Sequence, residues 1–184
     1  MTEPLAEALA SPIGSADPAS YYPGPGDVAH PGPADVRLSR EIRHAIVRHA
    51  RAALPNEACG LVIGDRPAPD GGEALRWLPL RNVLESPFRY EIAPEHLLRV
   101  TIETERSGEA IWAIVHSHVA SPARPSPTDV RQSFYPETLY VLVSLDPLEA
   151  DPLTGAEGIR SWRIVDGTVH EVAIVDEPMS ESPA

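Results

Sequence analysis

Apolar residues recur at helical spacing in the first structured part of the chain. Ile42 and Ile46 lie one turn apart, Ser39 stands where an N-cap is expected, and Pro55 stops the pattern. Side chains four residues apart share one face of a helix, so this spacing predicts an amphipathic helix over residues 39–54.

Proline marks the start of two further helices. Pro94 suits the first helical turn, and the pattern after it continues to about Ser107 before a glycine. Pro127 follows Ser126, a suitable N-cap, and the pattern after it extends to about Phe134. The chain therefore contains at least two long helices.

Short apolar runs between turn residues predict strands. The predicted strands cover residues 59–64, 74–83, 88–92, 111–115, 139–145, 159–165 and 168–175. Asp166-Gly167 is a two-residue signal for a tight hairpin between the last two strands. The run at 111–115 is continuously apolar, as in a strand covered on both faces. Strands alternating with helices indicate an α/β fold with a mixed sheet.

The two ends of the 184-residue chain differ from its middle. Residues 1–36 are rich in proline, glycine, alanine and acidic side chains, and we expect a disordered tail there. Residues 176–184 form a short acidic C-terminal tail, which leaves residues 37–175 as one domain.

Charge and composition narrow the classes of function. The net charge is −12, but the two tails hold eight acidic residues and no arginine, which leaves −4 for residues 37–175. A domain without a basic stripe is not expected to bind nucleic acid. No apolar run is long enough to span a membrane, and no signal peptide is recognisable. The single cysteine, Cys59, fits a reducing compartment, so we expect a cytoplasmic protein.

Candidate chemistry follows the apolar run at 111–115. His116 and His118 are two residues apart, so on a strand their side chains point to the same side. Asp129, eleven residues after His118, can return as a third ligand across a short loop. Three such ligands can bind one Zn²⁺ and leave its fourth position open to water, as catalytic zinc sites require.

Each of these residues also has an ordinary structural explanation. Histidines often close a buried strand through hydrogen bonds alone, and Ser126 with Asp129 resembles a helix-capping arrangement. An acidic residue such as Glu57, beyond the end of a helix, is usually solvated. The conjunction favours a site, because a strand supplies two imidazoles and the next helix begins with a hydroxyl and a carboxylate.

The set of residues resembles the motif of the JAMM (MPN+) metallopeptidases. That motif is a glutamate ahead of a strand, then His-Ser/Thr-His, ten intervening residues and Asp, with Ser three positions before the Asp. Glu57, His116-Ser117-His118, Ser126 and Asp129 match it, whereas Val119 replaces the proline that usually follows the second histidine. The short chain and the Glu-Ala-Cys-Gly sequence are most similar to bacterial stand-alone members, including actinobacterial enzymes that act on sulfur-carrier proteins.

The resemblance implies a curved mixed sheet sandwiched by helices, with a β-α-β core like that of cytidine deaminases. It also implies one Zn²⁺ held by His116, His118 and Asp129, with Glu57 as general base and Ser126 as oxyanion donor. The implied reaction is hydrolysis after the C-terminal Gly-Gly of a ubiquitin-like or sulfur-carrier protein, with release of a single amino acid such as cysteine. The alternatives are an isopeptidase on lysine-linked conjugates and a non-catalytic scaffold. The residues that would bind the substrate, and the oligomeric state, are not indicated.

Overall fold

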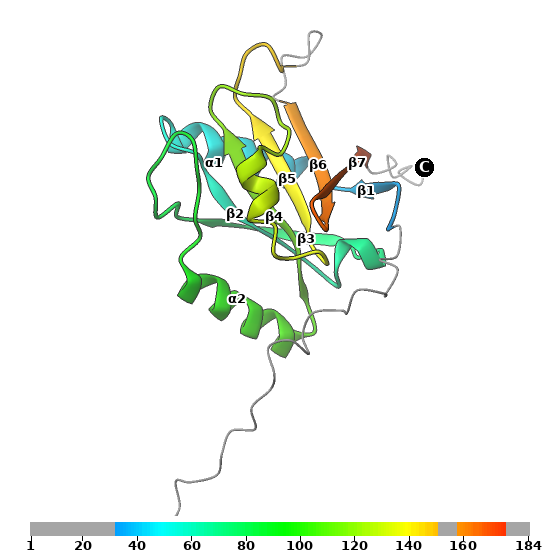
Figure 1. Ribbon diagram of the computed structural model, residues 1–184. Coiled ribbons are helices and arrows are strands. Elements are labelled where there is room, and N and C mark those ends of the chain that lie inside the picture. Colours follow the sequence, from blue (N-terminus) through cyan, green and yellow to red (C-terminus); the bar gives the residue numbers. More distant parts are fainter. Residues whose placement is uncertain (1–31, 151–157, 176–184) are drawn as a thin grey trace, which may run out of the picture.

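A seven-stranded mixed sheet organises the fold (Figure 1). The computed structural model describes residues 32–150 and 158–175. Most of the two predicted tails, residues 1–31 and 176–184, therefore lies outside the described residues. The strand order is β1-β7-β6-β5-β4-β2-β3, and the strands are β1 (Asp35–Arg37), β2 (Cys59–Gly64), β3 (Ala74–Leu80), β4 (Ala110–His118), β5 (Leu139–Ser144), β6 (Gly158–Val165) and β7 (Thr168–Val175).

In this strand order β4 lies inside the sheet, between β5 and β2. It pairs antiparallel with β2 and parallel with β5, and β1 pairs parallel with β7, whereas the remaining pairs are antiparallel. A strand with neighbours on both sides has its backbone groups satisfied by the ladders. The C-terminal end of β4 is therefore a rigid place from which to present side chains.

Two long helices cover opposite faces of the sheet. The first is α1 (Arg40–Ala53). Its N-cap is Ser39, whose hydroxyl accepts a 3.3 Å hydrogen bond from the amide of Ile42. The second, α2 (Pro94–Ser107), ends at Gly108, which adopts a left-handed conformation with φ 71°. A short helix, α3 (Pro127–Arg131), and the 3₁₀ turn η2 (Ala68–Asp70) complete the helical segments of the described residues.

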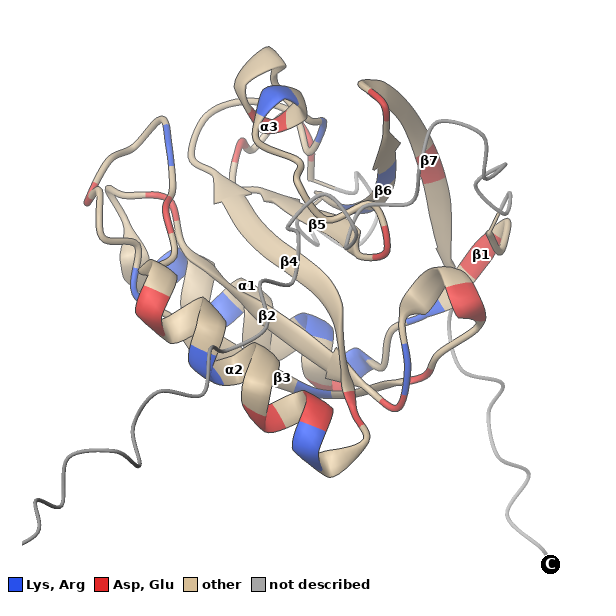
Figure 2. Cartoon of the chain, turned by 60° about the horizontal axis from the view of Figure 1, so that its bottom comes forward, with Lys and Arg blue, Asp and Glu red and all other residues tan. Residues whose placement is uncertain are grey.

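Each face of the sheet has its own apolar core. On the α1 face, Ile46 and Ala50 pack with Val115 of β4 and Val143 of β5. On the other face, Ile114 and Leu142 pack with Val100 of α2 and with Trp162 of β6. Figure 2 shows that charged residues lie on the helices, on the loops and on outer strands such as β1 and β7, whereas β4 and β5 carry none. The histidines of β4 share their face with Ile114, so they lie on the α2 side of the sheet.

The observed architecture confirms the predicted α/β class with a mixed sheet between helices. Both long helices and most strands lie where the apolar patterns predicted them. Among the described residues, no helix is long and apolar enough to cross a membrane.

Four local predictions differ from the structure. The strand predicted over residues 74–83 ends at Leu80, because Asn82 starts a turn in which its side-chain oxygen accepts from the amide of Leu84. The strand predicted over residues 88–92 is wrong, since this segment is a loop with one isolated bridge between Asn82 and Ile92. The helix α3 ends at Arg131 instead of about Phe134, because the next amides bond to carbonyls only two or three residues back, Ser133 to Val130 and Phe134 to Gln132. The disordered tail predicted over residues 1–36 extends too far, because Asp35 and Val36 belong to the strand β1, which pairs with β7; so short a strand shows no periodicity.

Candidate active site and metal centre

The C-terminal end of β4 presents two buried histidines. His116 and His118 are 1% and 5% exposed, and strand alternation directs both toward the α2 side. His116 pairs with Cys59 of β2 in the antiparallel ladder. Cys59 is itself buried and its pKa is raised to about 12, mainly by burial and secondarily by Glu57, so it is a structural thiol.

Asp129 reaches the histidines from the first turn of α3. The Ser126 hydroxyl accepts a 3.2 Å hydrogen bond from the amide of Asp129, and the Asp129 carboxylate accepts a 2.6 Å bond from the amide of Ser126. This reciprocal capping box fixes the carboxylate at the start of the helix. The capping explanation considered for Ser126 and Asp129 is therefore true, and it also positions the carboxylate.

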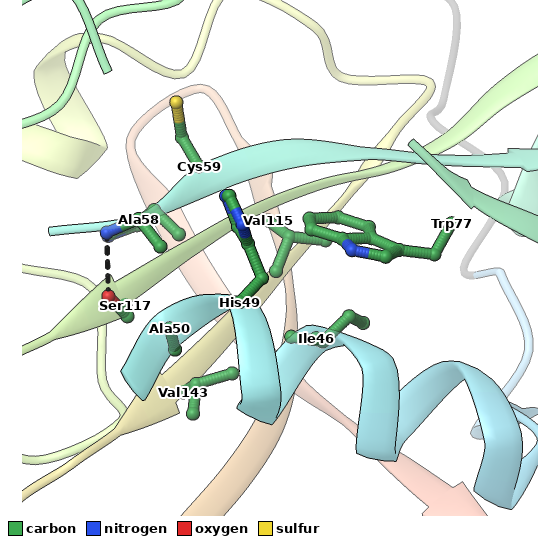
Figure 3. Close-up of a pocket in the computed structure, with 10 residues that line it drawn as sticks. Ile46, His49, Ala50, Ala58, Cys59, Trp77, Val115, Ser117 and Val143 are labelled. Atoms are coloured by element: carbon green, nitrogen blue, oxygen red, sulfur yellow. Dashed lines mark hydrogen bonds between the residues drawn. The ribbon is translucent and has the colours of Figure 1, made fainter. Parts of the chain in front are cut away.

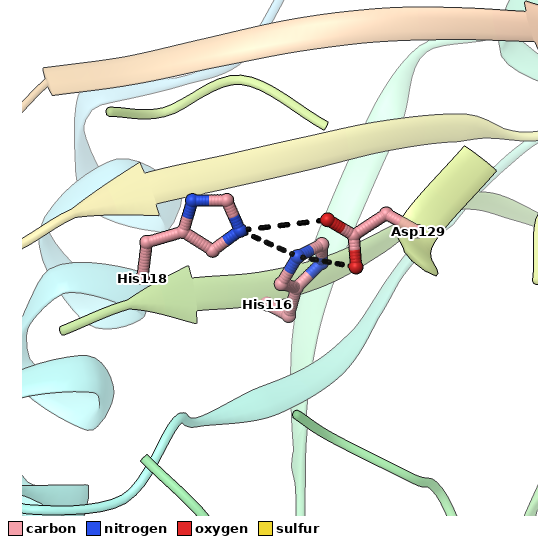
Figure 4. A group of neighbouring side chains, drawn as sticks. All are labelled: His116, His118 and Asp129. Atoms are coloured by element: carbon pink, nitrogen blue, oxygen red, sulfur yellow. Dashed lines mark hydrogen bonds and ion pairs between the residues drawn. The ribbon is translucent and has the colours of Figure 1, made fainter. Parts of the chain in front are cut away.

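The three side chains form one compact cluster (Figure 4). The Nε2 atoms of His116 and His118 are 3.2 Å apart, and they lie 3.5 and 3.6 Å from the two carboxylate oxygens of Asp129. Zinc bonds to nitrogen and oxygen measure about 2.0 to 2.2 Å, which places two ligands of a tetrahedral ion roughly 3.3 to 3.6 Å apart. The donor set and its spacing therefore fit a zinc ion.

Hydrogen bonding settles which nitrogen of His118 faces the cluster. Its Nδ1 lies 2.6 Å from the carbonyl oxygen of Pro122, which can only accept. The proton is therefore on Nδ1, and the Nε2 lone pair is free for a metal. Burial alone would lower the pKa of His118, but the contacts with Asp129 and the Pro122 carbonyl raise it above the ordinary value.

Charge in the cluster is held mainly by Asp129. Burial works to raise the pKa of this carboxyl, but the neighbouring imidazoles of His116 and His118 outweigh burial and hold the pKa well below its ordinary value. His116, by contrast, has a lowered pKa because it is buried. An ionised carboxylate beside a neutral His116 is the protonation state that zinc binding needs, whereas His118, whose pKa is raised, gives up any proton on Nε2 when zinc binds.

Glu57 occupies the turn between α1 and β2 and is only 6% exposed. Burial raises the pKa of its carboxyl to about 7, and the charges of His118 and Asp129 act on it in opposite directions. The ordinary alternative, a solvated carboxylate beyond the helix, therefore does not apply to Glu57. A carboxyl with a pKa near neutrality beside the cluster can accept and release a proton at physiological pH.

Ser126 keeps a free donor. Its oxygen accepts the bond from the Asp129 amide, so the hydroxyl hydrogen remains available to another acceptor. The side chain is half-buried at the N-cap, next to the ligand. The structure thus brings all five motif residues to the segments around one end of β4.

Ser117 has a role that the sequence motif alone did not indicate. Its side chain lies between those of the two histidines along the strand but points to the α1 face, where its hydroxyl accepts a 2.8 Å hydrogen bond from the amide of Ala58 (Figure 3). Its own amide donates a 3.0 Å bond to the Ala58 carbonyl. Because Ala58 follows Glu57, Ser117 fixes the start of β2, and with it Glu57, against the strand that carries the histidines.

Replacing Ser117 by alanine is expected to destabilise the protein. The variant keeps the backbone bond to Ala58 but leaves a buried amide without its acceptor, which costs about 1 to 3 kcal/mol. Urea unfolding measures this loss, and Ser107→Ala, which removes a hydroxyl at the far end of α2, serves as the control. An unfolding free energy equal to that of the native protein would show that the hydroxyl does not hold Ala58.

Two hollows adjoin the start of β2. The hollow in Figure 3, between α1 and the sheet, has apolar walls and room for about one water molecule. A groove of about 430 Å³ opens beside Glu57 and is lined also by His49 and Ala53 of α1 and by Arg81. None of the three metal-cluster residues lines this groove.

Known proteins are similar to this chain in sequence and in fold. Residues 39–165 match the family described as prokaryotic homologs of the JAB domain. The chain is 38% identical to the CysO-cysteine peptidase of Mycobacterium tuberculosis over 136 residues, which are 73% of this chain and 86% of that protein. It is 34% identical over 139 residues to a probable TtuB-protein conjugate cleaving protease of Thermus thermophilus, covering 75% of this chain and 78% of that protein.

A solved structure agrees with the sequence match. A protein from Desulfitobacterium hafniense, determined in solution, superposes with a TM-score of 0.64 at 34% identity and covers 79% of this chain and 95% of its own. The family match spans more than half of the chain and includes Glu57, both histidines, Ser126 and Asp129. The chain therefore belongs to the prokaryotic JAB-domain family.

Proposed function

We propose that this protein is a zinc-dependent peptidase that hydrolyses the bond after the C-terminal Gly-Gly of a ubiquitin-like or sulfur-carrier protein. One observation carries the proposal: the ligand atoms of His116, His118 and Asp129 lie within 4.8 Å of one another, beside a buried glutamate whose pKa is about 7. A scaffold without activity has no need for this combination. The names of the relatives, a CysO-cysteine peptidase and a conjugate cleaving protease, support a hydrolase.

The protein's own groups divide the chemistry between them. His116, His118 and Asp129 would hold one zinc ion, which as a Lewis acid polarises a carbonyl and activates water. Glu57 would take the proton from the attacking water and deliver it to the departing amine. The free hydroxyl of Ser126 would donate a hydrogen bond to the oxygen that becomes negatively charged.

The preferred substrate is a carrier protein that bears a single amino acid, such as cysteine. The described domain is compact, and its long β3-to-α2 connection folds back against Glu57 instead of extending as an arm for gripping a second protein. A lysine-linked protein conjugate is the competing substrate.

The proposal is tested with two matched substrates. One is a sulfur-carrier protein extended by one cysteine after Gly-Gly, and the other is the same carrier linked through an isopeptide bond to a lysine side chain. We expect mass spectrometry to show faster loss of the single residue by the zinc-loaded protein. Faster cleavage of the isopeptide would favour a deconjugating enzyme, and failure to bind zinc under metal-replete conditions would favour the scaffold.

A further inference from the structure

The loop between β3 and α2 contacts the proposed metal site through an aromatic ring. Tyr90 stacks on His116, with 4.3 Å between the ring centroids and 20° between the ring planes. Tyr90 also packs against the apolar core on the α2 face of the sheet. The loop thus covers one face of a proposed ligand.

The two histidines are oriented in different ways. The Nδ1 of His118 is held by the 2.6 Å hydrogen bond to the Pro122 carbonyl. The Nδ1 of His116 is buried and has no hydrogen-bond partner among the described residues. The outer ring torsion of histidine is intrinsically broad, so a ring without such a bond takes its orientation from packing. The stacked ring of Tyr90 provides that packing for His116.

Asn82 fixes the loop that carries Tyr90. Its side-chain amide donates to the carbonyl oxygens of Glu57 and Arg89, at 3.0 and 2.9 Å. Its side-chain oxygen accepts from the amides of Leu84 and Glu91, both at 3.1 Å. Asn82 is only 8% exposed, so these four bonds are sheltered from water.

The same loop holds the backbone of Glu57 from both sides. The Glu57 amide donates a 2.9 Å bond to the carbonyl of Ser86, while its carbonyl accepts the bond from Asn82. One segment, residues 81–92, therefore contacts both the proposed general base and a proposed metal ligand. A change in the loop would move both groups.

We propose that Tyr90 is a positioning residue that sets the ring orientation of His116 through stacking, within a loop that Asn82 fixes to Glu57. The inference rests on the proposed zinc site but not on any particular substrate. Residues that orient a metal ligand without touching the metal typically alter metal affinity by about 10- to 100-fold when they are replaced. Tyr90 differs from the usual examples because it acts through a ring face.

The test compares Tyr90→Phe, which keeps the ring, with Tyr90→Leu, which does not. Each protein is loaded with Co²⁺, whose visible absorption bands report ligand geometry, and zinc affinity is measured by competition with a chelator. We expect Tyr90→Phe to match the native protein in both readouts. We expect Tyr90→Leu to shift the cobalt bands and to bind zinc about 10- to 100-fold more weakly.

Val172→Ala is the control for general destabilisation of the core. It shows whether a change in the cobalt spectrum is specific to the loss of the Tyr90 ring. Val172 is a buried residue of β7, in the core on the opposite face of the sheet. A cobalt spectrum altered as much by Val172→Ala as by Tyr90→Leu would overturn the proposal, as would native spectrum and affinity in Tyr90→Leu. Neither readout requires a substrate, so a native protein that binds metal but cleaves no carrier would contradict the proposed function and leave the positioning role intact.

Discussion

Replacing Glu57 by glutamine is expected to lower the turnover number by about 10²- to 10⁴-fold while the protein still binds zinc. Glutamine has nearly the shape of glutamate but cannot accept a proton. The backbone contacts of residue 57, to Ser86 and Asn82, do not involve the side chain and should persist. The expected loss of turnover therefore comes from the missing proton acceptor and not from a displaced backbone.

The same substitution is expected to stabilise the metal-free protein. Burial raises the pKa of Glu57 from 4.5 to about 7, so the folded state prefers the neutral carboxyl. That contribution to stability is complete below pH 4.5 and is lost as the pH rises through 7. The neutral glutamine avoids the loss. The pKa change corresponds to about 3 kcal/mol at most, and solvent screening of the carboxylate reduces the expected gain to about 1 to 2 kcal/mol above pH 7.

Three measurements together test the role of Glu57. Elemental analysis reports zinc, hydrolysis of the extended carrier reports turnover, and urea unfolding of metal-free protein at pH 4.5 and 8 reports stability. Glu103→Gln, a change of the same kind at an exposed position of α2, is the control. Activity retained in zinc-loaded Glu57→Gln would exclude Glu57 as the base, and a stability difference independent of pH would contradict its raised pKa.

The parts of the site that could be predicted from the sequence are those governed by short-range rules. Alternation along a strand brings the side chains of His116 and His118 to one side, and helix-start signals place Ser126 and Asp129 together in the first turn of α3. Both relations involve residues only two or three positions apart. The family motif then supplied Glu57, which lies far from β4 in the sequence.

The supporting contacts could not be predicted because they join distant segments through side chains. Tyr90 and Ile92 alternate with polar residues and therefore resemble a strand, but the amide of Glu91 bonds to the side chain of Asn82 instead of to a neighbouring strand. Periodicity detects alternation and cannot detect this partner. Ser117 is similar, since nothing in its neighbours indicates a bond to Ala58, 59 residues away.

Replacing Asp129 by asparagine is expected to weaken zinc binding by about 100-fold or more. Replacing a residue that only orients a metal ligand typically costs about 10- to 100-fold in metal affinity, and Asp129 is itself a proposed ligand. The asparagine oxygen can still accept the bond from the Ser126 amide, so the capping box and α3 should be preserved. The variant loses the negative charge of the carboxylate, and the two histidines cannot supply a negative charge to the zinc ion. Competition with a chromogenic chelator measures the affinity.

Asp146→Asn is the control for Asp129→Asn. It shows whether loss of an aspartate that accepts a backbone hydrogen bond is enough to weaken zinc binding. Asp146 also accepts a backbone hydrogen bond, from Leu148, but it is not part of the metal cluster, so this variant should bind zinc as the native protein does.

In the metal-free protein the lowered pKa of Asp129 means that its stabilising contribution is present above pH 3.8 and is lost as the pH falls further. Metal-free Asp129→Asn should therefore be less stable than the native protein at neutral pH, with a difference that shrinks in acid. Zinc binding of native strength in Asp129→Asn would remove Asp129 from the ligand set, whereas weak binding with an intact helix would assign the loss to the carboxylate charge.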